Sequence, residues 1–184
     1  LVVRDERYLQ EVTSKQKGYW GYHDYRNSRI EDYRKGALQL AELGYTVFRM
    51  GKHVKGKFSV LHPNIIDYAN SSYRNDFLDL WLMAHCKLCI STCTGLDHVA
   101  LCFGRPIAFI NFLPLGDACS WHPTVNVPKK LFWLTDGRLL SFSEYVRFSL
   151  NNLEDYARHG IGIEDLSEDE IVSCMLEAEQ RFRG

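Results

Sequence analysis

A run of small polar residues follows an apolar stretch of the chain and is a candidate site for binding an anion. Its hydroxyl groups and glycine are Ser91, Thr92, Thr94 and Gly95, and an apolar, helix-like stretch comes directly after it. Hydroxyls and the N–H groups at a helix start bind phosphate, and glycine lets the backbone approach it closely. The alternative is an ordinary helix-capping turn, where Ser and Thr are common for structural reasons.

Arginines follow the first strand-like segments of the sequence. Arg4 ends the segment Leu-Val-Val-Arg, Arg49 begins an Arg-Met-Gly sequence, and Arg26 lies in the sequence His-Asp-Tyr-Arg-Asn-Ser. A guanidinium group binds phosphate bidentately, through two parallel hydrogen bonds. We therefore expect the three side chains to converge near the hydroxyl-rich run. The alternatives are that Arg4 and Arg49 pair with surface carboxylates and that the segment around Arg26 only caps a helix.

Histidine and cysteine side chains near the same run offer further chemistry. His98 follows Thr94 by one helical turn, so it faces the run and is placed to donate to a phosphate or a sugar hydroxyl; an ordinary, partly buried histidine explains it equally well. Cys93 with His98 suggests a nucleophile and a base, but the sequence shows no third group to orient them. Cys86, Cys89 and Cys93 have a metal-site-like spacing, yet Cys89 belongs to an apolar strand, so buried thiols are favoured over a metal site.

Alternating apolar patterns place these residues in a regular succession of strands and helices. The predicted strands cover residues 1–4, 45–50, 64–69, 87–91 and 106–112, and the predicted helices cover 28–43, 77–84 and 96–103. Ser28 and Glu31 have the spacing of a capping box at the start of the first helix. Strands that alternate with helices over short connections predict an α/β fold: a doubly wound, mainly parallel sheet with helices on both faces.

The pattern is weaker after residue 114. Residues 131–134 and 139–140 predict a strand pair joined by a turn at Asp136-Gly137, and residues 143–150 predict a short helix. A second capping box, Ser167 with Glu170, begins a terminal helix over 167–183 that we expect to pack on the sheet. The chain of 184 residues is thus predicted to form one domain over 1–184.

Composition excludes several classes of protein. Lys and Arg number 22 and Asp and Glu 23, a formal charge of −1, so the sequence predicts no overall attraction to nucleic acid. No apolar run is long enough for a transmembrane segment, and the six cysteines suit buried thiols in a reducing cytosol. Neither G-x-G-x-x-G nor a P-loop occurs. The first residue is Leu1, so we expect the sequence to be a piece of a longer protein.

The same segments carry a resemblance to a known family. The sequences HDYRNS (23–28), RMG (49–51), IIDYANS (65–71) and the long block over 75–111 resemble the donor-binding, C-terminal half of GT-B glycosyltransferases. The nearest resemblance is to a bacterial glycosyltransferase family with HDxRNS and RMG motifs, mostly without assigned substrates. More distantly, Thr94-Gly95 with His98 is similar to a block of heptosyltransferases, although Cys93 departs from it, and the strand ends resemble those of fucosyltransferases that use GDP-fucose.

The resemblance implies a Rossmann-like domain that binds a nucleotide-sugar donor of UDP or GDP type. It implies that the diphosphate contacts the following residues: Arg4, Arg26, Arg49, Ser91, Thr92, Thr94 and Gly95. It implies that the sugar or nucleotide contacts Asn27, Gly51, Leu96 and His98. Asp24 is the best candidate for a catalytic base, with tying down a loop arginine as its alternative role. A DxD triplet is absent, which agrees with a reaction that needs neither metal nor cofactor.

The predicted function is transfer of a sugar to a glycan, lipid or polysaccharide acceptor in the bacterial cytoplasm, in peripheral contact with the inner face of the membrane. The resemblance also implies an acceptor-binding N-terminal half that is missing from these 184 residues, so the activity of the chain alone is open. The alternative function is a non-catalytic module that binds a nucleotide or an anionic glycan. A third class, another small α/β enzyme such as a phosphatase, lacks a visible nucleophile.

Overall fold

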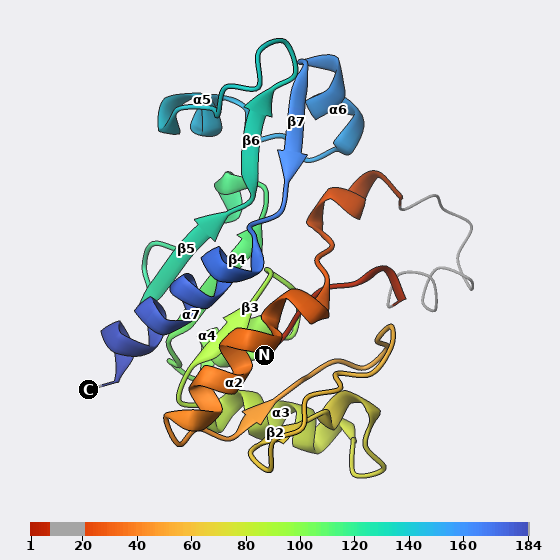
Figure 1. Cartoon of the computed structure of the whole chain (residues 1–184), viewed down its shortest axis with the longest axis vertical. Helices are drawn as coiled ribbons and strands as arrows, with labels where there is room; N and C mark the ends of the chain where they lie inside the picture. Colours follow the sequence, from red (N-terminus) through yellow and green to blue (C-terminus); the bar gives the residue numbers. More distant parts are fainter. Residues whose placement is uncertain (8–20, 184) are drawn as a thin grey trace.

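The computed structural model describes residues 1–7 and 21–183 and is a mixed α/β fold built on parallel strands (Figure 1). The parallel strands are β1 (Val47–Phe48), β2 (Ile65–Ile66), β3 (Cys89–Ser91), β4 (Ile107–Phe112) and β5 (Thr124–Pro128). Strands β1 and β2 pair with each other, and β3, β4 and β5 pair in that order. The prediction of a parallel α/β sheet is therefore confirmed.

The first residues of the chain join the two sets of strands. Leu1 donates from its amino group to the carbonyl of Phe48 at 2.9 Å, next to β1. Val2 donates to the carbonyl of Ile90 at 2.8 Å and forms a parallel bridge to β3. Across the sheet the order is therefore β2, β1, the terminal segment (residues 1–3), β3, β4, β5. This order is consistent with a Rossmann-like doubly wound fold, whose strand order reverses beside the first strand.

Helices cover both faces of the sheet. One face carries α2 (Arg34–Glu42) and α7 (Glu168–Phe182), and the other carries α3 (Asp76–His85) and α4 (Asp97–Cys102). The fully buried strand β4 supplies both layers, because successive side chains of a strand point to opposite faces. Ala108 and Ile110 pack under α2 and α7, whereas Ile107 and Phe109 pack under α3 and α4.

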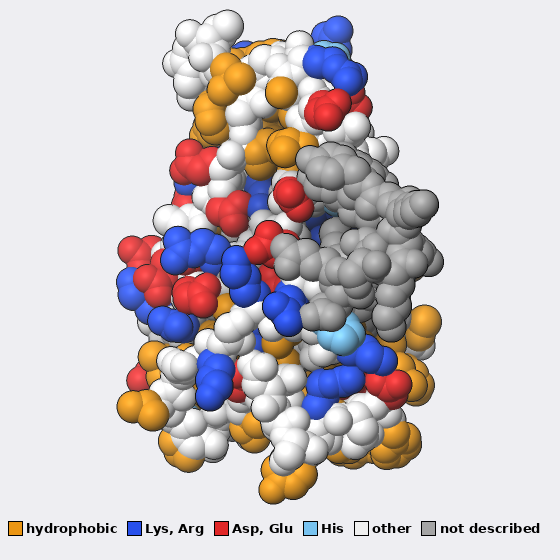
Figure 2. Space-filling view, turned by 90° about the vertical axis from the view of Figure 1, so that its right-hand side faces the viewer, with side chains coloured by type: hydrophobic (Ala, Val, Ile, Leu, Met, Phe, Trp, Pro, Cys, Tyr) orange, Lys and Arg blue, Asp and Glu red, His pale blue; other side chains and the backbone are white. Residues whose placement is uncertain are grey.

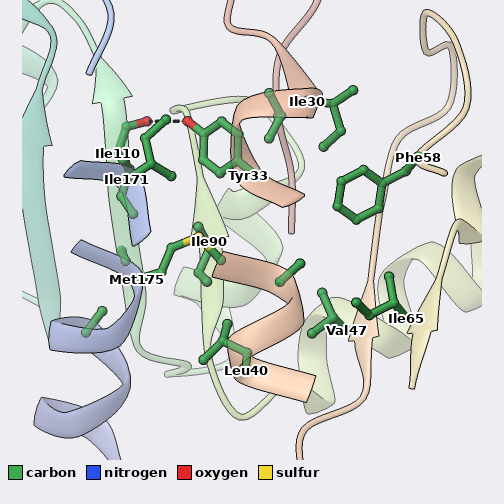
Figure 3. Close-up of a cluster of buried hydrophobic side chains, with 14 of the residues drawn as sticks. Ile30, Tyr33, Leu40, Val47, Phe58, Ile65, Ile90, Ile110, Ile171 and Met175 are labelled. Carbon is green, nitrogen blue, oxygen red and sulfur yellow. Dashed lines mark hydrogen bonds between the residues drawn. The ribbon is translucent and has the colours of Figure 1, made fainter. Parts of the chain in front are cut away.

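The core beneath α2 and α7 contains one buried hydroxyl that is bonded to the sheet (Figure 3). Tyr33 is fully buried among Ile110, Ile171 and Met175, and its hydroxyl donates to the carbonyl of Ile110 at 3.3 Å. Burial raises the pKa of Tyr33 far above its usual value, so the hydroxyl remains a neutral donor. This bond fixes the start of α2 against the end of β4.

A smaller unit, which we call the hairpin unit, extends beyond the sheet and covers residues 130–164 (Figure 1). It consists of β6 (Lys130–Trp133), α5 (Phe142–Arg147), α6 (Leu153–Arg158) and β7 (Ile161–Glu164), with β6 and β7 antiparallel. Its apolar core includes Leu131, Tyr156 and Ile161. Tyr25, from the turn η1 (Gly21–Arg26), packs into the same cluster against Tyr156, with ring centroids 5.6 Å apart. The hairpin unit therefore holds η1 in place.

Several elements differ from the prediction in the first half of the chain. The expected helix over 28–43 begins as the 3-10 turn η2 (Ile30–Tyr33) and becomes α-helical only at Arg34. The prediction of a capping box formed by Ser28 and Glu31 is wrong. Arg29 is the residue before η2, and it makes no side-chain cap. The backbone N–H of Ser28 instead donates to the carbonyl of Arg4 at 2.9 Å, which ties this position to the end of the terminal segment.

The second half of the chain contains elements that the sequence pattern did not indicate. Strand β6 pairs with β7 over its length, and its predicted partner contributes only a single bridge, Phe132 to Leu139. Strand β5 and helix α6 were not predicted. Short 3-10 turns complete the described elements: η3 (Tyr68–Asn70) and η4 (Leu115–Asp117). The terminal helix is confirmed, with Ser167 and Glu170 forming the predicted capping box.

This capping box gives the first testable prediction. The ammonium of Lys130, 2.8 Å away, and the N–H and hydroxyl of Ser167 lower the pKa of Glu170 from 4.5 to about 2. A carboxyl with a lowered folded-state pKa stabilises the fold above its unfolded value, and the stabilisation disappears as pH falls from 4.5 toward 2. We expect Glu170→Gln to lose less stability than wild type over this pH window, measured by urea unfolding.

The control is Ser173→Ala in the same helix, which changes no titratable group. Ser173 donates to the carbonyl of Asp169 from the exposed side of α7. The free energy of unfolding of Ser173→Ala should depend on pH in the same way as that of the wild type. Parallel stability curves for Glu170→Gln and wild type between pH 4.5 and 2 would show that the contacts of Glu170 do not stabilise the fold.

Candidate functional site

The candidate site lies where the terminal segment and β3 end side by side. The backbone N–H of Arg4 donates to the hydroxyl of Thr92 at 2.8 Å, and the N–H of Thr92 donates to the carbonyl of Val2 at 3.1 Å. The chain leaves these neighbouring strands toward opposite sides of the sheet. In open α/β sheets such a junction, at the carboxyl ends of the strands, is where ligands bind.

The hydroxyl-rich turn after β3 is organised by a buried carboxylate that the sequence analysis missed. Asp97, fully buried, accepts hydrogen bonds from the hydroxyl of Ser91 and the backbone N–H of Thr94. Thr94 and Asp97 have capping-box spacing, which is the signal that could have identified this contact. Cys93 adopts a left-handed conformation, with φ of 63°, to complete the turn. Asp97 therefore occupies donors that we had expected to bind phosphate.

Other groups of the turn remain open. The hydroxyl oxygen of Thr94 is buried and has no hydrogen-bond partner within the described ranges. Gly95 is exposed, and a Cβ atom built on it meets no atom within 4 Å, so nothing in the protein requires a glycine here. An unpartnered buried hydroxyl costs stability unless something bonds to it. The turn thus presents a hydroxyl beside an open backbone position.

Arg26 reaches the turn from η1, as predicted. Its Nη2 lies 3.2 Å from the carbonyl oxygen of Cys93 and 3.6 Å from the Cys93 thiol. Its other contact is loose, since Nη2 is 3.8 Å from the half-exposed carboxylate of Asp117. The Nε atom is buried, and among residues 1–7 and 21–183 nothing accepts from it. Arg26 is therefore held at the turn with donor capacity to spare.

Arg4 lies in the same place and also lacks a carboxylate partner within the described residues. Its Nε donates to the side-chain oxygen of Asn27 at 3.4 Å, and the Asn27 amide donates to Asp24 at 3.2 Å. The pKa of Arg4 is lowered, first by burial and then by the neighbouring Arg26 charge. Burial lowers the pKa of His23 as well, and Arg4 and Arg26 lower it further. These side chains gather positive charge that residues 1–7 and 21–183 only partly neutralise.

This positive charge is local. Figure 2 shows Lys and Arg side chains beside Asp and Glu side chains across the middle of the face drawn, so basic residues do not dominate the described part of that face. The prediction from composition, a formal charge of −1 without an overall basic field, fits this view. The positive charge at the candidate site therefore comes from the particular pair Arg4 and Arg26 and not from a general surface potential.

A buried lysine, which the sequence analysis also missed, fixes the segment that carries Asn27. Lys129, at the end of β5, is 3% exposed. Its ammonium group donates to the backbone carbonyl of Asn27 and to the carboxylate of Asp165. Burial lowers the pKa of Lys129, and Asp165 opposes that shift. Asn27 is therefore anchored through its backbone, and its side chain is left to contact Arg4 and Asp24.

Arg49 does not join this group. Its side chain is 1% exposed and donates to the carboxylate of Asp67 at 3.2 Å and to the carbonyls of Gly56, at 3.2 Å, and Lys55, at 3.4 Å. A carboxylate of Asp5 lies 3.9 Å away. These contacts follow the alternative interpretation, in which Arg49 pairs with carboxylates. The guanidinium organises the loop after β1, so the expected convergence of three arginines reduces to Arg4 and Arg26.

Of the remaining predicted site residues, Leu96 and His98 follow the turn, whereas Gly51 lies in the loop after β1. Leu96 packs against the core under α3 and α4, and Gly51 adopts φ of 146° against Val54. His98 is exposed, with its Nδ1 atom 3.1 Å from the carbonyl oxygen of Thr94 and 3.0 Å from a carboxylate oxygen of Asp97. His98 therefore borders the turn, and Leu96 and Gly51 contribute packing and backbone shape.

The cysteines are buried thiols or lie apart. Cys89 and Cys93 are buried and Cys86 is partly buried, and all six cysteines of the chain are free. Burial raises the pKa of Cys93 and, more strongly, that of Cys89. Among residues 1–7 and 21–183, no group of His, Cys, Asp and Glu side chains is arranged to hold a metal ion. These thiols are protonated at neutral pH and act as small core residues.

An apolar cavity lies at the other end of the strands. It has a volume of about 410 Å³ and is lined mainly by apolar side chains, among them Leu1, Phe48, Trp81 and Leu88. Leu88 precedes β3 and Leu1 begins the terminal segment, so this cavity opens at the amino ends of the strands. It is separate from the site formed by Arg4, Arg26 and Thr94.

Comparison with known proteins assigns no family to this chain. No family model matches it, and neither the curated proteins nor the solved structures contain a match. In the part of the chain that the structure describes, no helix combines the length and the apolar character needed to cross a membrane. The resemblance to glycosyltransferases therefore remains a prediction, and the site has to be judged on its own geometry.

The different roles of the arginines give the second prediction. Removing one partner of a buried ion pair leaves the other charge uncompensated, so Arg49→Met should lower the free energy of unfolding by about 3–5 kcal/mol. The control is Arg181→Met, which removes an exposed pair with Glu177 on α7 and should cost no more than about 0.5 kcal/mol. Urea unfolding followed by circular dichroism measures both variants. Equal stability of the two would show that the contacts of Arg49 do not hold the loop.

Proposed function

We propose that this chain is the nucleotide-sugar-binding domain of a metal-independent glycosyltransferase. The observation that carries the proposal is the pairing of Arg4 and Arg26 at the junction of the terminal segment and β3. Both guanidinium groups contact the hydroxyl-rich turn or the segment next to it, and neither has a close carboxylate partner within the described ranges. Guanidinium groups with unfilled donors are typical of phosphate-binding sites.

A diphosphate fits the available groups better than a neutral ligand does. Burial and the neighbouring charge of Arg26 lower the pKa of Arg4, and an anion between the two guanidinium groups would relieve their repulsion. The buried hydroxyl of Thr94 and the buried Nε of Arg26 need hydrogen-bond acceptors, which phosphate oxygens supply. Because Asp97 occupies the N–H of Thr94 and the hydroxyl of Ser91, most of the binding falls to the side chains of Arg4, Arg26 and Thr94.

In the proposed reaction the acceptor hydroxyl oxygen forms a bond to the anomeric carbon of the donor sugar. The bond from that carbon to the diphosphate oxygen breaks, and the diphosphate leaves with the bonding electron pair. Arg4 and Arg26 stabilise the negative charge that develops on it, which lowers the barrier to leaving. The acceptor proton passes to a base, for which Asp24 is the candidate, since it is exposed and lies in the Asn27 network beside Arg4.

The wider setting is part of the same proposal. The donor is a UDP or GDP sugar, and the acceptor is a glycan, lipid or polysaccharide, processed in the bacterial cytoplasm near the inner face of the membrane. These statements rest on the resemblance of the HDYRNS and RMG segments to bacterial glycosyltransferases. The second candidate function, binding of a nucleotide or anionic glycan without turnover, needs the same Arg4 and Arg26 site. A measurement of turnover distinguishes the transferase from the non-catalytic module.

The third prediction tests binding. UDP, GDP, ADP and CMP are titrated into the protein by calorimetry, and at least one diphosphate should bind more tightly than the monophosphate. A hydrogen bond to a charged group contributes about 1.5–3 kcal/mol, so Arg26→Gln should raise the dissociation constant by about 10- to 150-fold. Thr94→Val should raise it by a smaller factor.

The matched control for Arg26→Gln is Arg181→Gln, which removes an exposed guanidinium far along the sequence on α7 and should leave the dissociation constant unchanged. Thermal unfolding of each variant without nucleotide establishes that it is folded. Failure of every nucleotide to bind below millimolar concentration would overturn the proposal. If neither Arg26→Gln nor Thr94→Val changes the dissociation constant, the nucleotide binds elsewhere on the protein.

The fourth prediction separates catalysis by Asp24 from a positioning role. Release of nucleoside diphosphate from a sugar nucleotide, with water as acceptor, reports turnover. A general base contributes about 100- to 10,000-fold, so Asp24→Asn should reduce the turnover number by about this much while the nucleotide dissociation constant changes less than about threefold. Asp24 contacts Asn27, which in turn contacts Arg4, so a positioning role would instead weaken binding. Tight binding without any turnover in the wild type would favour the non-catalytic module.

A further inference from the structure

Helix α3 presents an apolar stripe to solvent. Tyr73, just before the helix, is 77% exposed, and along the helix Phe77 is 71%, Leu80 53% and Trp81 47% exposed. Phe77, Leu80 and Trp81 have the spacing of side chains on one face of a helix, and Tyr73 precedes that helix. Scattered exposed apolar residues are ordinary, but a continuous stripe of this kind marks a surface that contacts something else.

The polarity of α3 is inverted relative to a surface helix. One of its two aspartates, Asp79, is buried on the core side, where Arg74 donates to it at 2.6 Å, while Phe77 and Trp81 face outward. A helix that is apolar on both its inner and outer faces is typical of helices that are covered on both sides. The inner side packs on the sheet through Met83 and its neighbours. The outer side is therefore the one that lacks a cover within the described structure.

The stripe supplies more than half of the area that one partner of a symmetric dimer buries. With about 150–250 Å² for a large side chain, the exposed fractions of Tyr73, Phe77, Leu80 and Trp81 amount to about 500 Å². A stable interface buries about 800 Å² on each partner. Trp81 also lines the cavity of about 410 Å³, whose apolar wall continues the stripe beyond the end of α3. The wall of the cavity therefore adds to the apolar area that a partner could cover.

The charges at the two ends of α3 indicate which partner fits. The first turn is acidic: the side chain of Asp76 lies 3.2 Å from the ammonium of Lys52 and is still 77% exposed. The last turn is basic, with His85 followed by the exposed Lys87. Two copies of such a helix are complementary when they run antiparallel, because each acidic end meets a basic end. The register that places Leu80 against Trp81 of a second copy also places Asp76 against His85 of that copy.

We propose that the outer face of α3 is the interface of a homodimer, in which the α3 helices of two copies of this chain pack antiparallel about a twofold axis near Leu80 and Trp81. The same patch then serves both copies, as closed twofold symmetry requires. The interface leaves the candidate site free, because Arg4 and Arg26 lie at the carboxyl ends of the strands and the interface lies on α3. This proposal does not depend on the proposed function.

Light scattering after gel filtration and sedimentation velocity measure the oligomeric state across a range of protein concentrations. The wild type should be a dimer, and Phe77→Glu and Trp81→Glu should each raise its dissociation constant by at least about 30-fold, as for a central interface residue. The matched control is Phe142→Glu, since Phe142 is 77% exposed at the start of α5 in the hairpin unit. The Phe142→Glu variant should remain dimeric.

The register has its own test. Asp76→Arg should weaken the dimer because it places like charges opposite one another, and Asp76→Arg combined with His85→Glu should restore it by exchanging the charges. Thermal unfolding confirms that each variant is folded. A wild type that stays monomeric at about 100 μM, or a dimer broken by Phe142→Glu and not by Phe77→Glu, would overturn the proposal. So would a monomer that sediments with anionic phospholipid vesicles through Phe77, because a membrane would then be the cover.

Discussion

The hydrogen bonds of residues 1 and 2 to strands on both sides determine the rest of this architecture. Leu1 bonds next to β1 and Val2 bonds next to β3, so one short segment joins the two sets of parallel strands. After the terminal segment the chain goes on to β1, which lies on one side of that segment. After β3 it goes on to β4, which lies on the other side. Arg4 and the turn after β3 therefore emerge together at the junction. Topology therefore places the candidate site at this junction.

The junction carries an energetic conflict that an anion would resolve. Asp97 is buried within the turn and satisfies the groups closest to it, so the turn is stable without a ligand. Arg4 and Arg26 remain nearby as partly buried cations that repel each other. Buried polar groups without partners, such as the Thr94 hydroxyl, also cost stability. Proteins keep costs of this kind mainly at functional sites, which is why this location is favoured over the apolar cavity.

The sequence predicts local features well and distant partners poorly. Ser167 and Glu170 form the predicted capping box because their partners lie within one helical turn. Ser28 and Glu31 have the same spacing, but the carbonyl of Arg4 takes the N–H of Ser28, so this position is held by the sheet and not by a helix cap. No local pattern distinguishes these cases, because the decisive partner of Ser28 lies 24 positions away in the sequence.

The same limit applies to the site. Arg4 and Arg49 both follow a strand, and the order of elements correctly places Arg4 beside the turn. The direction of the Arg49 side chain depends on Asp67 and on the backbone at residues 55–56, which no pattern around Arg49 reveals. Strand β7 likewise pairs with β6 across a long connection. Asp97 is the exception, since its spacing from Thr94 is a local signal that was present and went unused.

The hairpin unit and the candidate site are coupled through buried contacts. Tyr25 packs against Tyr156 of the hairpin unit, and the next residue, Arg26, reaches the turn. On the other side, Lys129, just before β6, bonds to the carbonyl of Asn27 and to Asp165, just after β7. Both ends of the hairpin unit thus constrain the segment that carries Arg26 and Asn27. A buried ammonium group bonded at both of these positions tolerates little displacement, because moving either partner leaves the charge unsatisfied. The position of Arg26 relative to Arg4 is therefore set by the packing of the hairpin unit as much as by the sheet.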